Sequence, residues 1–329
     1  MRRREFIAGV VAATAFPSAV HGQRIEPVRR VDILVAEANE DDPYYERRLA
    51  VLRDGLRDLG WIEGQNLSLN IHRSAPRAAD IRKHVDEILA GRPDVIVTSG
   101  GTTAGPILQA TKIVPVVFMS AIDPVGAGFV ESLAHPGGKA TGYMQFDYSL
   151  SAKWLELLKQ AVPSTVRVGV IRDPTVPSGI GQFAVIQSVA GSVGVDIIPI
   201  NTRNAGEIES GIAKLARSPN GGLIATSGAA VNGHRDLIVQ LAARYRLPAV
   251  YAGRMFVDHG GMIAYGADVV TNYRRAAGYV DRILKGEKPA DLPVQAPDKY
   301  DLVINLKAAK ALGLELPANV VSRADEVIE

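Results

Sequence analysis

Short apolar runs alternate with amphipathic segments from residue 31 onward, and this alternation limits the possible folds more than any other feature. The runs at residues 31–36, 67–71, 94–98 and 114–119 are rich in Val and Ile and are apolar nearly throughout. Strands have this composition when helices cover both faces of a parallel sheet. The intervening segments have helical spacing, so the pattern predicts an α/β fold in which helices wrap parallel sheets.

The alternation restarts in the second half of the chain, after a Pro-Gly-Gly turn at residues 136–138 and a helical segment that contains Trp154. A chain of 329 residues exceeds the usual size of one compact domain, whereas two lobes of roughly 130 to 150 residues fit it. The sequence therefore predicts two lobes. The apolar runs of the second lobe are residues 166–172, 196–200, 222–226 and 248–251.

The N-terminal segment, residues 1–22, has the layout of a secretory signal. It begins with arginines, an apolar run covers residues 6–16, and Val20-His21-Gly22 stands where a signal has its small-residue cleavage region. The apolar run is too short to span a bilayer. Arg3-Arg4-Glu5-Phe6-Ile7 also resembles the twin-arginine export motif. We expect cleavage after about Gly22, a linker at residues 23–30 and a periplasmic location; a membrane anchor or an ordinary unfolded-export signal is the alternative.

Charge and cysteine content exclude several classes of protein. The formal charge of +2 is accounted for by the N-terminal segment, so the remainder of the chain is neutral. A neutral body without a basic cluster interleaved with aromatics argues against nucleic acid as a partner. The sequence contains no cysteine, which excludes disulfides, thiolate catalysis, cysteine-ligated zinc and a lipid-modified N-terminal cysteine.

The loop Ser99-Gly100-Gly101-Thr102-Thr103 is the strongest candidate for a ligand site. It follows the run at residues 94–98, and ligands of open parallel sheets lie beyond the carboxyl ends of strands, where helix N-termini converge. The glycines permit close approach of the backbone, while the hydroxyls and the helix start suit a carboxylate. Helix capping, which contributes about 1 kcal/mol to the helix and nothing to a ligand, is the alternative.

Loops after the other predicted strands supply the remaining candidates, and each has a structural alternative. Asp123 and Pro124 can simply shape a turn, Arg254 can pair with a surface carboxylate, and Tyr44 and Tyr45 can either form an aromatic wall or open the first helix. The candidate ligand-binding residues are Glu37, Ser99, Gly100, Gly101, Thr102, Thr103, Ser120, Ala121 and Asp123 in the first lobe, and Asp173, Ser178, Ser227, Tyr251 and Arg254 in the second.

Sequence signatures of catalysis do not occur in the chain. It contains no P-loop, no dinucleotide fingerprint, no Gly-x-Ser-x-Gly elbow and no His-Glu-x-x-His helix. Asp123 with His135 or Asp173 is the remaining acid-base alternative. We therefore predict no catalytic residue, no cofactor and no metal site. The histidines, at positions 21, 72, 84, 135, 234 and 259, lack ligand spacing, and each is predicted to be a surface or satisfied residue.

Several segments together resemble a known family. They are Gly60-Trp61-Ile62-Glu63-Gly64-Gln65-Asn66, the stretch from Asp123-Pro124-Val125-Gly126-Ala127-Gly128 to Pro136-Gly137-Gly138, and the tail at residues 279–329. The chain is similar in these segments to the bacterial ABC transporter substrate-binding family, whose better-known members bind tryptophan or related aromatic amino acids. His135 and Lys139 stand where the family usually has Arg and Asn, and residues 75–80 are atypical.

The resemblance implies a type 1 periplasmic-binding fold, with two Rossmann-like lobes joined by a three-crossing hinge. The first lobe is expected at residues 31–144 plus 262–288, and the second at residues 145–261 plus 289–329. The protein is then expected to be a monomer that closes around a small carboxylate-bearing ligand and docks on an ABC permease in the inner membrane. A ligand-sensor subunit for a membrane receptor kinase and an exported α/β enzyme are the alternatives.

Overall fold

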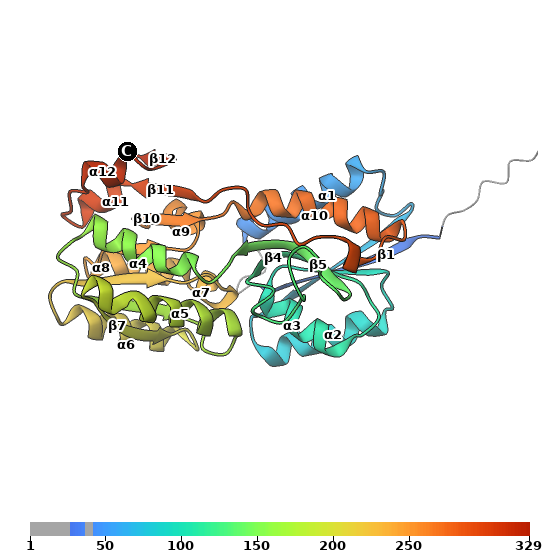
Figure 1. Ribbon diagram of the computed structural model, residues 1–329, viewed down its shortest axis with the longest axis horizontal. Helices are drawn as coiled ribbons and strands as arrows, with labels where there is room; N and C mark the ends of the chain where they lie inside the picture. The colour runs from blue at the N-terminus through green and yellow to red at the C-terminus, as the bar shows by residue number, and fades with distance from the viewer. Residues whose placement is uncertain (1–26, 37–41) are drawn as a thin grey trace, which may run out of the picture.

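The computed structural model describes residues 27–36 and 42–329, which form two α/β lobes along the long axis of the molecule (Figure 1). The predicted export signal, residues 23–26 of the expected linker and Glu37 lie outside the described residues. Within the described part of the chain, every helix is too short or too polar to cross a bilayer. The predicted fold class is confirmed, since both lobes contain helix-covered sheets that are parallel or mostly parallel.

The first lobe is built on a five-stranded sheet in the order β2-β1-β3-β4-β5, in which all neighbouring strands are parallel. Helices α1 and α10 pack on one face of this sheet, and α2 and α3 pack on the other. The elements are β1 (Arg29–Ala36), α1 (Pro43–Asp58), β2 (Leu67–Ser74), α2 (Ala78–Ala90), β3 (Val95–Thr98), α3 (Gly101–Ala110), β4 (Val116–Ile122), β5 (Ala140–Phe146), α10 (Val269–Leu284) and a short 3-10 turn at Pro289–Asp291.

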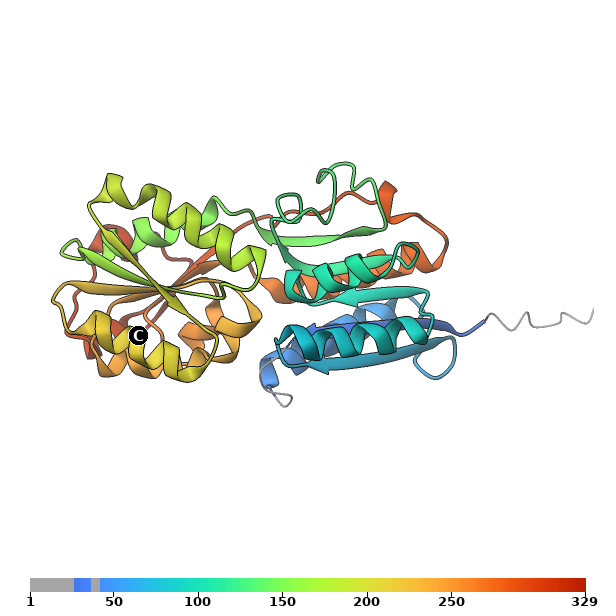
Figure 2. The ribbon, with the colours of Figure 1, turned by 90° about the horizontal axis from the view of Figure 1, so that it is seen from below.

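The second lobe has a seven-stranded sheet in the order β12-β11-β10-β9-β8-β6-β7, where only the β10–β11 pair is antiparallel. Figure 2 shows its helices on both faces of the sheet. The elements are α4 (Leu150–Ala161), β6 (Arg167–Arg172), α5 (Pro177–Ala190), a 3-10 turn at Gly191–Val193, β7 (Asp196–Asn201), α6 (Ala205–Ala216), β8 (Gly221–Ala225), α7 (Ala229–Gly233), α8 (Arg235–Arg244), β9 (Ala249–Tyr251), α9 (Arg254–Asp258), β10 (Ile263–Gly266), β11 (Asp301–Asn305), α11 (Leu306–Ala311), α12 (Ala318–Val321) and β12 (Glu326–Ile328).

The chain crosses between the lobes three times: after β5, after β10 and before β11. Two crossings differ from the expected boundaries. We expected the return to the first lobe at residue 262, but β10 pairs with β9 and β11 of the second sheet, so the return begins at α10. We expected departure at residue 289, but the backbone N–H of Gln295 still donates to the Gly142 carbonyl at 2.9 Å. Both crossing points are set by β-pairing between segments that are separated in the sequence.

The apolar stripe of α1 shows how the sequence pattern becomes a core. Leu49, Leu52 and Leu56 are at most 1% exposed and pack against the first sheet. Leu59, which follows the last residue of α1, is 42% exposed. The helix ends at Asp58, and the chain turns away at Gly60, whose φ of 89° is a left-handed conformation that favours glycine. The segment between the first two predicted strands is therefore helical, as its spacing predicts, and the turn at Gly60 marks its end.

Candidate functional site

A cavity of about 70 Å³ lies where the carboxyl ends of strands from the two lobes meet. Its lining comes from the carboxyl ends of β1, β4 and β5, from the loops after β3 and β8, and from the first turns of nearby helices, as expected for open parallel sheets. The first lobe contributes Ala36, Tyr45, Arg48, Ser99, Gly100, Gly101, Thr102, Ser120, Ile122, Gln145, Val269 and Tyr273, and the second contributes Ser178, Ser227, Gly228, Ala229 and Asn232.

The loop from Ser99 to Thr102 lines the cavity, and its neighbours hold it in place. The hydroxyl of Ser99 accepts a hydrogen bond from the Ala36 N–H at 3.3 Å. A Cβ on Gly100 would lie 3.0 Å from the Ser120 carbonyl oxygen, so glycine allows this close approach. Helix α3 begins at Gly101 and presents its free N-terminal amides at this point. The loop therefore offers hydroxyls and a helix start to an anion.

Thr103, which we included among the candidates, faces away from the cavity. It is fully buried, and its hydroxyl donates to the Gly100 carbonyl oxygen at 3.0 Å. Because this hydroxyl is engaged within the loop, Thr103 stabilises the turn into α3 instead of forming part of the lining.

Arg48 is the charged residue in the described lining of the cavity. It lies on α1, it is 7% exposed, and its guanidinium carbon is 3.9 Å from the centroid of the Tyr44 ring. Burial disfavours the charged guanidinium, but the surrounding tyrosines outweigh burial and raise the pKa of Arg48. Among the described residues, its Nε has no hydrogen-bond partner and no carboxylate forms an ion pair with it. The cavity thus contains a buried cation that can accommodate an anionic group.

Gln182 organises the second-lobe wall of the cavity. It is fully buried on α5, and its Oε1 accepts from the Ser227 N–H at 2.9 Å. Its Nε2 donates to the carbonyl oxygens of Ser178 and Ser227, both at 2.9 Å. One side chain therefore ties the first turn of its own helix, which carries Ser178, to the loop after β8, which carries Ser227, and both residues line the cavity.

Two contacts join the lobes around the cavity. Gln145, at the end of β5, accepts through Oε1 from the Ser227 hydroxyl at 3.2 Å and from the Ser120 hydroxyl at 3.4 Å. Nearer the surface, Arg235 of α8 forms a buried ion pair with Asp42, which also caps α1 by accepting from the Tyr44 N–H. The lobes are therefore in direct contact beside the cavity, and we refer to this as the closed arrangement.

A second cavity of about 420 Å³ adjoins the first and shares Arg48, Ser227, Asn232 and Val269 with it. Tyr44 also lines this outer cavity. We refer to the smaller cavity as the inner cavity and to the larger one as the outer cavity, and Arg48 lies in the wall of both. This pair of cavities suits a ligand that has a small anionic end and a bulkier group.

Four more of the predicted site residues lie outside both linings. Asp123, at φ 41°, accepts from the Gly126 N–H at 2.8 Å and shapes a turn. Asp173 accepts from both the N–H and the hydroxyl of Thr175, and Ala121 is fully buried in β4. Tyr251 is stacked on Phe256 with ring centroids 4.8 Å apart, and burial raises its pKa. Turn geometry and packing account for these side chains.

Arg254 and Glu37 complete the account of the predicted residues. Arg254 lines the outer cavity but not the inner one. Its guanidinium pairs with Glu326, and also with Asp258 at 3.3 Å. The hydrogen bond with Glu326 is the main cause of its raised pKa. Glu37 lies outside the described residues.

The sequence interpretation missed Arg48, Gln145, Gln182, Asn232 and Tyr273. Arg48 had a signal, because Tyr44 and Tyr45 precede it by one helical turn and an arginine stacks on tyrosine faces. The two glutamines had none, since Ser227, which both of them contact, is 82 residues from Gln145 and 45 residues from Gln182 in the chain.

Comparisons with known proteins agree with this architecture. The family model described as ABC transporter substrate binding protein matches residues 33–328. A tyrosine-binding protein of Clostridioides difficile is 23% identical over 260 residues, which are 79% of this chain and 74% of that protein.

Two solved structures illustrate the similarity in fold. A conserved domain protein from Vibrio cholerae has a TM-score of 0.83 at 26% identity, and covers 91% of this chain and 99% of its own. An ABC domain from Streptococcus pneumoniae, solved in complex with L-Trp, has a TM-score of 0.81 at 22% identity with the same coverage.

Proposed function

Because the chain belongs to the family of ABC transporter substrate-binding proteins, we propose that it is the exported component of an importer and closes around a small ligand that bears a carboxylate. An amino acid or aromatic acid is the proposed ligand class. The layout of residues 1–22 supports export to the periplasm, and the family supports docking of the closed form on an inner-membrane permease.

Arg48 is the observation that carries this proposal. A buried guanidinium without a carboxylate partner among the described residues costs free energy unless an anion reaches it. The inner cavity supplies the remaining parts of a carboxylate site, namely the Ser99 and Thr102 hydroxyls and the N-terminal amides of α3. A carboxylate at this point would be bound mainly by the first lobe.

The outer cavity supports an aromatic or similarly large side chain on the ligand. It is several times larger than the inner cavity, and Tyr44 lies in its wall. The Clostridioides difficile relative is named for tyrosine binding, and the Streptococcus pneumoniae structure contains L-Trp. On this basis we propose tyrosine, tryptophan and related aromatic acids as the first compounds to test.

Binding and closure are coupled in this proposal. A ligand that contacts both lobes only in the closed form shifts the equilibrium toward that form by its differential affinity. The Gln145–Ser227 hydrogen bond and the Asp42–Arg235 ion pair both join the lobes and would form as the cleft shuts. No bond of the ligand is broken in this cycle.

A ligand panel with matched amines tests the proposal. Purified mature protein is heated with tyrosine, tryptophan, phenylalanine and indole acids, and in parallel with tyramine and tryptamine, which lack the carboxylate. We expect at least one acid to raise the melting temperature and its matched amine to leave it unchanged. Equal stabilisation by an acid and its amine, or no stabilisation by any acid, would contradict recognition of an aromatic carboxylate.

A further inference from the structure

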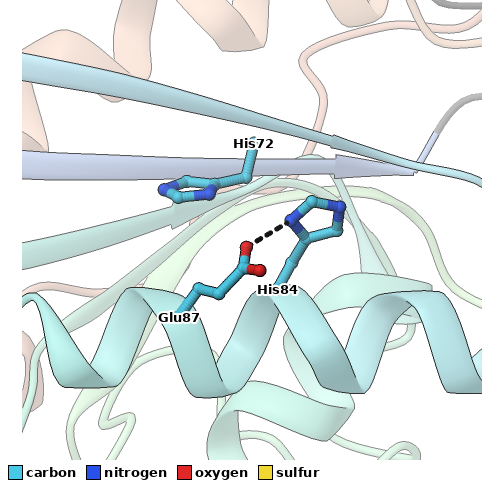
Figure 3. A group of neighbouring side chains, drawn as sticks. All are labelled: His72, His84 and Glu87. Carbon is cyan, nitrogen blue, oxygen red and sulfur yellow. Dashed lines mark hydrogen bonds and ion pairs between the residues drawn. The ribbon is translucent and has the colours of Figure 1, made fainter.

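A cluster of two histidines and a glutamate lies on the first lobe, apart from the linings of the cleft. His72 is on β2, the edge strand of the first sheet, and His84 and Glu87 are one turn apart on α2, which packs on that sheet. Figure 3 shows the three side chains turned toward one another between the strand and the helix. The spacing of the histidines in the sequence does not indicate this cluster, because the two histidines belong to different elements.

The donor atoms of this cluster are already close together. One ligand atom from each residue lies within 4.8 Å of the other two, and the Nδ1 of His84 is 3.2 Å from a Glu87 oxygen. Ligands of a tetrahedral zinc ion lie about 3.4 Å apart, given metal–ligand distances near 2.1 Å. Small rotations of partly exposed side chains would bring the three donors into that range.

Asp32, on the neighbouring strand β1, orients His72. The carboxylate of Asp32 is fully buried on β1, and its Oδ1 is 2.8 Å from the Nε2 of His72. An ionised carboxylate at Nε2 favours the tautomer that carries the proton there, which leaves the lone pair on Nδ1. Figure 3 shows the His72 ring beside Glu87 and His84. This carboxylate–histidine arrangement is the one that commonly supports a metal-ligating imidazole.

Its neighbours hold the carboxylate of Asp32 in place. The side-chain amide of Asn70 donates to Asp32 at 3.3 Å, in addition to the contacts with Arg30 and His72. The Arg30 Nε lies 2.7 Å from the second oxygen of Asp32, so this anion keeps a partner whether or not a metal is bound. Asp32 can therefore support His72 without becoming a ligand.

We propose that His72, His84 and Glu87 form a binding site for a late first-row divalent metal ion, represented by Zn²⁺, with Asp32 as the group that positions His72. Two imidazoles and one carboxylate suit Zn²⁺, Ni²⁺ or Cu²⁺ and disfavour Mg²⁺ and Ca²⁺, which require oxygen ligands. The side chains of the three residues are 18%, 25% and 48% exposed, so the ion has access and a fourth position remains for water.

The site is independent of the proposed transport ligand. None of its three residues lines the inner or the outer cavity, and metal binding requires no closure of the lobes. Zinc binding and amino-acid binding can therefore be measured separately, and each can fail without the other.

Zinc competition against a chromogenic chelator tests the site with untagged mature protein. We expect one Zn²⁺ per chain for the unmodified protein, and at least a tenfold loss of affinity for His72→Ala, His84→Ala and Glu87→Gln. Asp32→Asn should lose about 10- to 100-fold, as is typical when a carboxylate behind a metal-ligating histidine is removed. Zinc should also raise the melting temperature of the unmodified protein and not that of His84→Ala.

His135→Ala provides the matched control, because His135 is exposed on a loop and only its backbone makes the hydrogen bonds with Ser132. This variant should bind zinc as the unmodified protein does. Stoichiometric zinc binding that persists in the His72→Ala/His84→Ala double variant would overturn the assignment. Displacement of zinc by equimolar Mg²⁺, or failure of the unmodified protein to compete with the chelator, would overturn it as well.

Discussion

The two lobes contribute different chemistry to the same cleft. The first lobe supplies a buried cation, Arg48, and the N-terminus of α3, whereas the described second-lobe lining of the inner cavity is neutral and polar. Gln182 holds that neutral wall by hydrogen bonds to Ser178 in the first turn of its own helix and to Ser227 in the loop after β8. The difference indicates a division of labour, in which the first lobe would select the charge of the ligand and the second would complete its enclosure.

Arg48→Met should have the largest effect on this division, because it removes the charge from the first lobe. Truncating one partner of a buried charge pair costs about 2–5 kcal/mol of binding, or roughly 30-fold to several thousand-fold in Kd. We expect a loss in this range for the tightest aromatic acid of the panel, measured by titration calorimetry.

The matched control for Arg48 is Arg53→Met on the same helix. Arg53 is exposed and lies 3.7 Å from Glu63, so its replacement should leave ligand affinity unchanged. If Arg48→Met bound the acid within threefold of the unmodified protein, the first lobe would not be the charge-selecting half.

The fold could be predicted further from the sequence than the site could. Strands of a parallel sheet that is buried on both faces are apolar throughout, so they can be recognised from the local sequence. These apolar runs located most strands of both lobes. The crossings near residues 262 and 289 were misplaced because strand pairing decides them. Whether Ile263–Gly266 joins one sheet or the other depends on β9 and β11, which the local pattern does not report.

Site residues divide by the range of the interactions that position them. Ser99, Thr102, Ser120 and Ser227 line the cavity, and all four lie at or just after the carboxyl ends of strands, where the topology of parallel sheets places ligand sites. Asp123 and Asp173 also follow strands, yet local hydrogen bonds to Gly126 and Thr175 turn their carboxylates into the loops. Position after a strand therefore predicts the neighbourhood of a side chain but not its direction.

Gln182→Met tests whether the second lobe acts through a fixed wall. It leaves the Ser227 N–H and two carbonyl oxygens without their partner, which should cost about 1–3 kcal/mol of folding free energy in a thermal or denaturant melt. We expect ligand affinity to fall by less than in Arg48→Met, since the first-lobe cation remains.

The comparison variant is Gln187→Met, an exposed glutamine on the same helix, which should match the unmodified protein in both stability and binding. A loss of affinity in Gln182→Met that equalled the loss in Arg48→Met would show that the neutral wall carries as much binding energy as the cation.

The Asp42–Arg235 ion pair should give the smallest effect when both partners are neutralised. Asp42 and Arg235 are both buried in the closed arrangement, and their side chains are 3% and 11% exposed. Water would hydrate both charges in an open form, so the cost of desolvation on closure offsets much of their attraction. The pair is therefore expected to fix the geometry of closure and to contribute little net free energy to it.

The double variant Asp42→Asn/Arg235→Met separates these two roles. The new amide at position 42 would still cap α1, and neutral groups of similar size would replace the pair, so we expect ligand Kd within about threefold of the unmodified value.

The single variant Arg235→Met should bind more weakly than the double variant, because it leaves the Asp42 carboxylate buried without its partner whenever the cleft shuts. Arg244→Met, at an exposed position on the same helix, is the control. A double variant that bound a hundredfold more weakly would mean that attraction between the lobes, and not the contacts of Arg48 with the ligand, supplies the free energy of closure.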